Sequence, residues 1–247
     1  MVSNLEIVFC DFLQRKFLLT HLSRFIGARF VTLLIWLLFV AGCANVPFQK
    51  ARQVSFESVD PKSVVEQFKA NSPENFQLLN SVVFEYSWKT FMGIGYIDID
   101  KQNSLFKVVC LNPLGVQLFE LSGDKNTIVI QNAMPALMQY GDLPTAVGND
   151  IRRIYFDLVP SDKARIWKSK YKVNFWQPYG SGVMEYEFAG IGRGLVEKVY
   201  YENDEIVWRI SYYEYREQNG KYFPQGIIMI NYKYGYQLTV RQKELFS

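Results

Sequence analysis

Two long stretches of this chain alternate between apolar and polar side chains, and this alternation is the feature that most constrains its fold. In the first stretch, Val82, Phe84, Tyr86 and Trp88 fall on one side of an extended backbone. A period of two is typical of a β-strand with one buried face. The pattern predicts strands from Phe76 to Trp88 and at 91–99, 104–111, 116–121, 127–131, 171–176, 182–188, 194–201, 206–215, 221–231 and 237–243.

The predicted strands, about eleven in number, are expected to pair with their neighbours in sequence. Asn219 and Gly220 form the strongest hairpin signal in the chain. Gly93 and Gly95 share one face of a strand, where they allow curvature or the close approach of a bulky group. We therefore expect a mainly β chain with a few helices, of the α+β class, forming an antiparallel barrel or a strongly curved sheet with helices at one side.

Two or three helices are predicted, and the positions of two follow from the sequence. Asp60 is a natural N-cap and Pro61 suits the first helical position, so a helix begins there and ends before Pro73. A second amphipathic helix is indicated by a stripe of apolar residues at helical spacing, formed by Ile151, Ile154, Tyr155 and Leu158. This second helix either covers one face of a sheet or forms a lid over a ligand cavity.

The N-terminal region has the pattern of a secretory signal with a lipobox. An apolar run at 30–40 follows Arg29, is too short to cross a bilayer comfortably, and leads through Ala41 and Gly42 to Cys43. This pattern is similar to the site at which bacterial lipoproteins are lipidated on cysteine and cut before it. We expect residues 1–42 to be removed, 43–58 to be a lipid-anchored tether and 59–247 to fold. The alternative is a membrane anchor in which the cysteine is incidental.

Composition restricts the chemistry that is available. The only histidine, His21, lies in the segment expected to be removed, which excludes Ser-His-Asp triads and histidine-based zinc sites. We expect that this protein is not an enzyme and that it uses no cofactor and no metal. A carboxylate hydrolase using Asp98 and Asp100 is an alternative, although a solvated strand edge explains this pair more simply. Without 1–42 the basic and acidic residues nearly balance, so nothing favours a nucleic-acid partner.

One segment carries a family resemblance. Residues Phe106–Leu121 read as a strand, the loop Asn112, Pro113, Leu114 and Gly115, and a returning strand. Together with the lipobox, an early helix and a later helical segment, this resembles the LolB-type outer-membrane lipoprotein receptors. The resemblance implies an unclosed antiparallel β-barrel with a helical lid that encloses an apolar cavity. It also implies that Leu114 is the exposed loop leucine that passes lipoproteins into the membrane.

The same resemblance implies a function without covalent catalysis. The protein would lie on the outer membrane facing the periplasm, receive acylated lipoproteins from a soluble LolA-like carrier and insert them into the membrane. Candidate walls of the acyl cavity are Phe84, Tyr86, Trp88, Val108, Leu118, Trp208 and Ile210, and the lid residues are Ile151, Ile154, Tyr155 and Leu158. The alternatives are a structural or interaction lipoprotein of the envelope, and a carrier of another lipid with the same fold. The presence of an open cavity would distinguish a lipid-handling protein from a purely structural one.

Overall fold

The computed structural model describes residues 46–138 and 143–246. Residues Phe48–Ser247 form a compact unit with a hydrophobic core of its own. The predicted signal segment and Cys43 lie outside the described residues. In the described part of the chain, no helix combines the length and the apolar character needed to cross a membrane.

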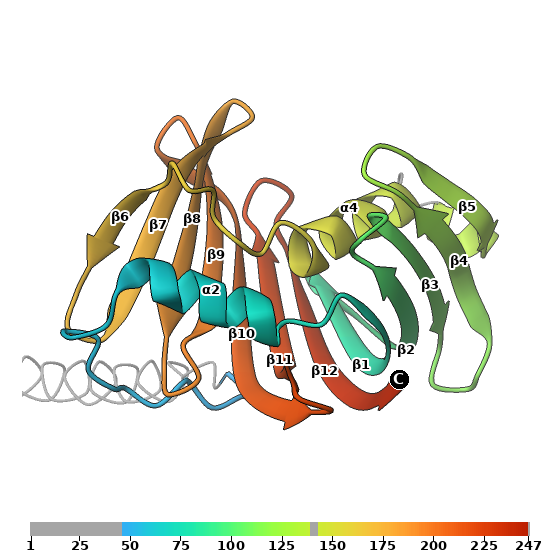
Figure 1. Cartoon of the computed structure of the whole chain (residues 1–247). Coiled ribbons are helices and arrows are strands. Elements are labelled where there is room, and N and C mark those ends of the chain that lie inside the picture. The colour runs from blue at the N-terminus through green and yellow to red at the C-terminus, as the bar shows by residue number, and fades with distance from the viewer. Residues whose placement is uncertain (1–45, 139–142, 247) are drawn as a thin grey trace, which may run out of the picture. The chain divides into compact units, whose positions relative to one another are not determined.

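A single antiparallel sheet dominates the described residues, and it is strongly curved and open (Figure 1). Its first half contains β1 (Asn75–Tyr86), β2 (Lys89–Asp100), β3 (Leu105–Leu111), β4 (Gln117–Gly123) and β5 (Ile128–Ala133). Its second half contains β6 (Arg165–Lys168), β7 (Lys172–Tyr179), β8 (Gly182–Ala189), β9 (Gly194–Glu202), β10 (Glu205–Gln218), β11 (Lys221–Asn231) and β12 (Tyr236–Phe246). The predicted mainly β fold is therefore confirmed, with 12 strands in the sheet.

The expectation that every strand pairs with a sequence neighbour was wrong at one position. The strand order is β5-β4-β3-β2-β1-β12-β11-β10-β9-β8-β7-β6, so the first and last strands pair in the middle of the sheet. Val82 lies opposite Val240 in this pairing. Because the chain leaves the sheet after β5 and returns as β6, those two strands form its free edges. Short β6 escaped prediction because all four of its residues are exposed, so it shows no buried alternation.

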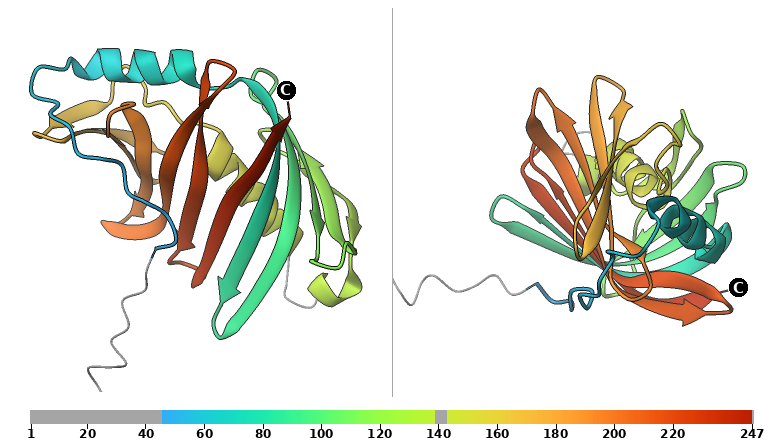
Figure 2. Two further views of the ribbon diagram at one scale, coloured as in Figure 1. Left: turned by 90° about the horizontal axis from the view of Figure 1, so that it is seen from below. Right: turned by 60° about the vertical axis from the view of Figure 1, so that its left-hand side comes forward.

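The helices lie inside the curve of the sheet (Figures 1 and 2). Helix α2 (Pro61–Asn71) begins as predicted, because the Asp60 side chain accepts a hydrogen bond from the Ser63 amide at 3.0 Å. A short helix, α3 (Pro135–Met138), precedes α4 (Leu143–Tyr155). Helix α4 packs against β4 and β5, and α2 packs against β9.

One residue of the predicted stripe, Leu158, does not belong to α4. Ile151, Ile154 and Tyr155 are buried on the helix, but Leu158 lies beyond its end. The helix stops at Tyr155 and Asp157 takes a left-handed conformation with φ 50°, which a continuing helix does not permit.

The segment expected to be a tether packs onto the sheet from Phe48 onward. The Phe48 ring stacks on Tyr213 with a centroid distance of 5.4 Å, and the Arg241 guanidinium lies 4.4 Å from the ring centroid. Phe56 is fully buried, and its amide donates to the backbone oxygen of Lys170 at 2.7 Å. Aromatic side chains in a mainly polar segment therefore attach it to the folded unit.

Candidate functional site

A cavity of about 810 Å³ lies between α4 and the strands β1, β2, β3, β4 and β12. Its volume is in the range of roughly 300–1,000 Å³ that is typical of ligand pockets. The predicted site residues that line it are Phe84, Tyr86, Val108, Leu118, Ile151, Ile154 and Tyr155. Ile97, Phe119, Leu238 and Val240 add to this mostly apolar wall. The structure therefore brings together residues from five strands and two helices, with Leu137 contributed by α3, around a space suited to an apolar ligand.

Two glycines help to form the wall of the cavity on β2. Gly93 and Gly95 both line it, in the row of β2 that also contains Ile97. A Cβ on Gly93 would lie 3.0 Å from the Cys110 Sγ, and one on Gly95 would lie 3.4 Å from a Val82 methyl group. The missing side chains leave space beneath α4, which is the close approach that glycines on one strand face allow.

Three predicted wall residues lie elsewhere. Trp88 is 83% exposed at the tip of the β1–β2 hairpin. Trp208 and Ile210 are buried in the core on β10 and do not line the cavity. Trp208 stacks on Tyr200 with a centroid distance of 5.7 Å. Period-two alternation predicted that one face of β10 is buried, but it does not show where along the sheet a cavity lies.

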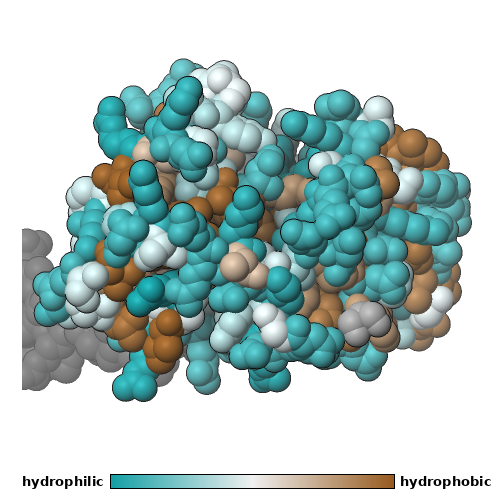
Figure 3. Space-filling model, viewed as in Figure 1, coloured by the Kyte–Doolittle hydropathy of each residue, from teal (hydrophilic) through white to brown (hydrophobic). Residues whose placement is uncertain are grey.

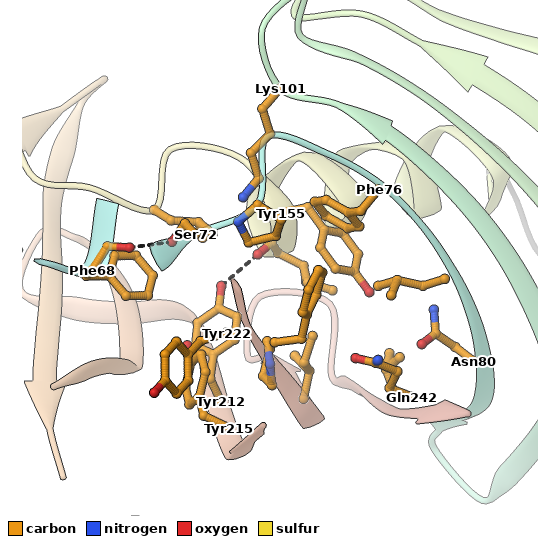
Figure 4. Close-up of a pocket in the computed structure, with 18 residues that line it drawn as sticks. Phe68, Ser72, Phe76, Asn80, Lys101, Tyr155, Tyr212, Tyr215, Tyr222 and Gln242 are labelled. Atoms are coloured by element: carbon orange, nitrogen blue, oxygen red, sulfur yellow. Dashed lines mark hydrogen bonds between the residues drawn. The ribbon is translucent and has the colours of Figure 1, made fainter. Parts of the chain in front are cut away.

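A second, much smaller pocket of about 40 Å³ lies nearby (Figure 4). Lys101, Tyr212 and Tyr222 line it, and so does Leu158, which was expected on the lid. Burial lowers the pKa of Lys101 to about 8. A space of this size holds only one to a few water molecules. The larger cavity is therefore the candidate ligand site.

One part of the cavity wall is polar. Asp150, on α4, accepts hydrogen bonds from the Tyr236 hydroxyl at 2.6 Å and from Arg153 Nη1 at 2.9 Å. Asn231 Nδ2 donates to the Tyr236 oxygen at 3.1 Å. Burial raises the pKa of Asp150 to about 6, although its two hydrogen-bond donors act in the opposite direction. The prediction missed this group, for which the only sequence signal is that Asp150 and Arg153 are one helical turn apart.

The C-terminal end of α4 is held by side chains of β9 and β10 and by the β4–β5 turn. Lys198, on β9, donates to the backbone oxygens of Arg153 and Phe156, each at 2.9 Å. The Tyr212 hydroxyl donates to the Ile154 oxygen at 2.8 Å, as drawn in Figure 4. Arg152 Nε donates to the Asp124 oxygen, which joins the helix to the β4–β5 turn. These bonds satisfy the last carbonyls of α4 and position it over the cavity.

The loop that carried the family resemblance has a defined geometry. The Asn112 side-chain oxygen accepts from the amides of Leu114 and Val116, each at 2.9 Å. Gly115 has φ 82°, which favours glycine. Leu114 is 87% exposed and therefore projects from the loop.

This loop lies at the same end of the sheet as Tyr86, which lines the cavity. β3 ends at Leu111, opposite Ile94, and the β1–β2 hairpin closes where Tyr86 pairs with Lys89. Tyr236 pairs with Tyr86, which brings the β11–β12 turn to this end as well. We call the end formed by the turns 87–88, 112–116 and 232–235 the mouth end.

The structure gives little support to the alternative of a carboxylate hydrolase that uses Asp98 and Asp100. Asp98 and Asp100 alternate with the buried residues Ile97 and Ile99, so they face away from the cavity. Asp98 accepts from Gln77 Nε2 at 3.1 Å, and Asp100 accepts from the Asn103 amide at 3.0 Å. Among residues 46–138 and 143–246, no group of three or more His, Cys, Asp or Glu side chains is placed to hold a metal.

The one cysteine in the cavity wall is buried. Cys110 is a free cysteine, and burial raises the pKa of its thiol to about 11. The thiol is therefore protonated at neutral pH. Nucleophilic attack would require the deprotonated thiolate. Cys110 serves here as an apolar wall residue.

Comparison with known proteins identifies the fold. The chain is similar to the crystal structure of an outer membrane lipoprotein-sorting protein domain from Vibrio parahaemolyticus, with a TM-score of 0.51 and 9% identity, covering 74% of this chain and 90% of that one. It is also similar to a LolA superfamily protein from Nitrosomonas europaea, with a TM-score of 0.50 and 12% identity, covering 76% and 93%. These similarities show a LolA-like fold.

Sequence comparison identifies the family. No curated protein matches the chain. Residues 77–244 match the model of one family, and this range extends from β1 to β12 and includes all of α4. The chain therefore belongs to the family described as "Protein of unknown function (DUF3261)".

Proposed function

We propose that this protein is a lipid-anchored lipoprotein of the outer membrane that holds the acyl chains of other lipoproteins and inserts them into that membrane. The observation that carries the proposal is the apolar cavity of about 810 Å³ beneath α4. A sheet filled by its own aromatic side chains would favour a structural role instead. The similarity in fold to a lipoprotein-sorting domain supports the same interpretation.

The energetics of transfer require no covalent chemistry. Each methylene moved from an apolar pocket into water costs roughly 0.8 kcal/mol, so acyl chains do not escape into the periplasm. Movement from a soluble LolA-like carrier into this cavity exchanges one apolar environment for another and is nearly neutral. An affinity difference of about 1.4 kcal/mol then gives a tenfold bias toward the better-fitting cavity.

The anchor in this proposal is Cys43, lipidated after removal of residues 1–42. Its support is the lipobox pattern in the sequence. Labelled palmitate added to growing cells is expected to enter the wild-type protein and not the Cys43→Ser variant. Equal labelling of the two proteins would contradict lipidation at this cysteine.

The cargo is tested directly with residues 46–247, because the folded unit carries its own core. Native mass spectrometry of this protein, exported behind a cleavable signal sequence and purified from the periplasm, is expected to detect bound acylated peptide. A bound lipid of another kind would identify a carrier of that lipid. Protein that remains empty, and that accepts no acylated lipoprotein from a loaded carrier, would contradict lipid handling and favour a structural or interaction role.

A further inference from the structure

Exposed apolar side chains gather at the mouth end of the sheet, on two turns and at the start of β2, and two of them, Met92 and Tyr234, also line the cavity. Trp88 is 83% exposed in the β1–β2 turn, and Met92 is 62% exposed close behind it. Tyr232 and Tyr234 are 46% and 60% exposed in the β11–β12 turn. Because Tyr86 pairs with both Lys89 and Tyr236, the two turns are neighbours. We call this set the aromatic edge.

The aromatic edge differs from the other exposed apolar surface of the protein. Figure 3 shows apolar atoms gathered over the β4–β5 region, where Val129 and Ile130 are exposed on an edge strand. The aromatic edge instead consists of turn residues and of Met92 near the start of β2, and it includes amphipathic rings. Tryptophan and tyrosine with a polar tip are typical of the boundary between water and hydrocarbon.

Two lysines lie at this end, together with Glu85 next to Tyr86 and with Glu202 near Lys233. Within the turns 87–88, 112–116 and 232–235 the charged residue is Lys233, and Lys89 follows the first turn as the first residue of β2. The Lys89 ammonium lies 5.2 Å from the centroid of the Trp88 ring. Lysine side chains beside interfacial aromatic rings favour anionic lipid headgroups.

We propose that the aromatic edge docks into the headgroup region of a bilayer that contains anionic lipid. Pairing with an added strand is excluded here, because β1 pairs with β2 and β12, and β11 pairs with β10 and β12. A turn with a single projecting tryptophan suits a fluid surface, whereas a tight protein complex needs matched surfaces with well-packed pockets.

The length of the anchor supports the same partner. Five residue steps separate Cys43 from Phe48, where the chain joins the sheet. Extended backbone of this length reaches about 18 Å at most. If Cys43 carries lipid, Phe48 is held within that distance of the bilayer surface. The inference from the anchor length rests on the proposed function, whereas the exposure of the residues of the aromatic edge does not depend on it.

Docking through the aromatic edge would orient the cavity relative to the bilayer. Tyr86 belongs both to the cavity wall and to the end that carries Trp88. Docking through this end would place the cavity over the membrane, with Leu114 on the adjacent turn. An apolar ligand could then move between cavity and bilayer over a short path.

The test uses residues 46–247 and vesicles of phosphatidylethanolamine and phosphatidylglycerol, separated by flotation. Wild-type protein is expected to float with the vesicles, and Trp88→Ser is expected to weaken binding about tenfold, as burial of one large apolar side chain predicts. The matched control is Trp167→Ser, because Trp167 is also an exposed tryptophan, at 56%, but lies on edge strand β6. This control is expected to bind like wild type.

A second measurement separates docking from misfolding. Lipids brominated near the headgroup are expected to quench Trp88 emission in the wild type, and this quenching disappears in Trp88→Phe, which keeps an aromatic ring. Failure of the wild type to float, or equal binding by Trp88→Ser, would overturn the proposal and favour a protein partner. Lipid bound in the cavity is measured separately by mass spectrometry, so failure of acyl binding and failure of docking are distinguishable.

Discussion

Lys198 caps the C-terminal end of α4 by donating a hydrogen bond to the backbone oxygen of Arg153 at 2.9 Å. Its nitrogen also lies 5.8 Å from the centroid of the buried Trp208 ring. Burial lowers the pKa of Lys198 to about 7, and the nearby Asp157 opposes this effect. A single buried lysine on β9 therefore connects the position of the helix over the cavity to the protonation state of the protein.

The unfolding free energy is expected to rise between pH 7 and pH 9, and to rise less in Lys198→Met. The unfolded lysine, with its ordinary pKa of 10.5, binds more protons in this range than the folded one, so stability increases with pH. The slope is at most about 1.4 kcal/mol per pH unit for one group. Chemical denaturation at the two pH values measures the difference. Parallel pH dependence in the two proteins would show that Lys198 titrates normally.

Asp150 is expected to have the opposite pH dependence. Its folded pKa of about 6 lies above its ordinary value of 3.8, so the folded state binds more protons between these values. Its contribution is therefore fully present below pH 3.8 and is lost as the pH rises through 6. Relative to Asp150→Asn, the wild type should lose about 2 kcal/mol between pH 4 and pH 7. Denaturation curves that differ by a constant amount across this range would contradict the raised pKa.

A side chain added at Gly95 is expected to occupy the cavity. Gly95→Leu should reduce bound acyl ligand at least about tenfold while the protein remains folded, because the nearest atom to the new Cβ is a methyl group at 3.4 Å. Native mass spectrometry measures bound ligand, and circular dichroism checks the fold. The matched control is Gly192→Leu, where the new Cβ meets no atom within 4 Å. Equal loading of the Gly95 variant would mean that ligand binds elsewhere.

The Phe48 ring is expected to contribute substantially to stability. A Cβ on Gly226 would overlap this ring, so the absence of a side chain on Gly226 makes room for it. Phe48→Ala should lower the unfolding free energy by about 3 kcal/mol, the cost of removing a buried phenylalanine. Val46→Ala, at a position that is 43% exposed, serves as control. If both variants unfold like wild type, the contact between Phe48 and the sheet does not stabilise the fold and the segment acts as a tether.

Leu114→Glu is expected to leave folding intact and to block release of a bound lipoprotein into membranes. The side chain is 87% exposed, so the change creates no buried charge, but it opposes entry into an apolar phase. Transfer from a loaded carrier to liposomes is the measurement. Ile191→Glu, at a turn position that is 67% exposed, is the matched control. Equal transfer by Leu114→Glu and wild type would remove Leu114 from the mechanism.

Several parts of the candidate site could be predicted because they depend on local sequence. The alternation of Val82, Phe84 and Tyr86 predicted that they share one face of a strand, which the structure turns toward the cavity, and the loop with Asn112 and Gly115 indicated a defined turn. Trp208 shows the limit of this reasoning, because alternation predicted one buried face on its strand, but its neighbours there are core side chains and it does not line the cavity. Burial in a core and exposure to a cavity produce the same alternation.

The sequence by itself determined where most strands run, where α2 begins and which loop presents Leu114, because each depends on residues close together in the chain. Only the tertiary structure decided that β1 lies beside β12, that Phe48 packs over Gly226, and that Asp150 and Tyr236 meet in the cavity wall. These pairs are distant in sequence and come together only when the sheet curves around α4. The cavity belongs to this second group, because its volume is the space that side chains from separate elements leave unfilled.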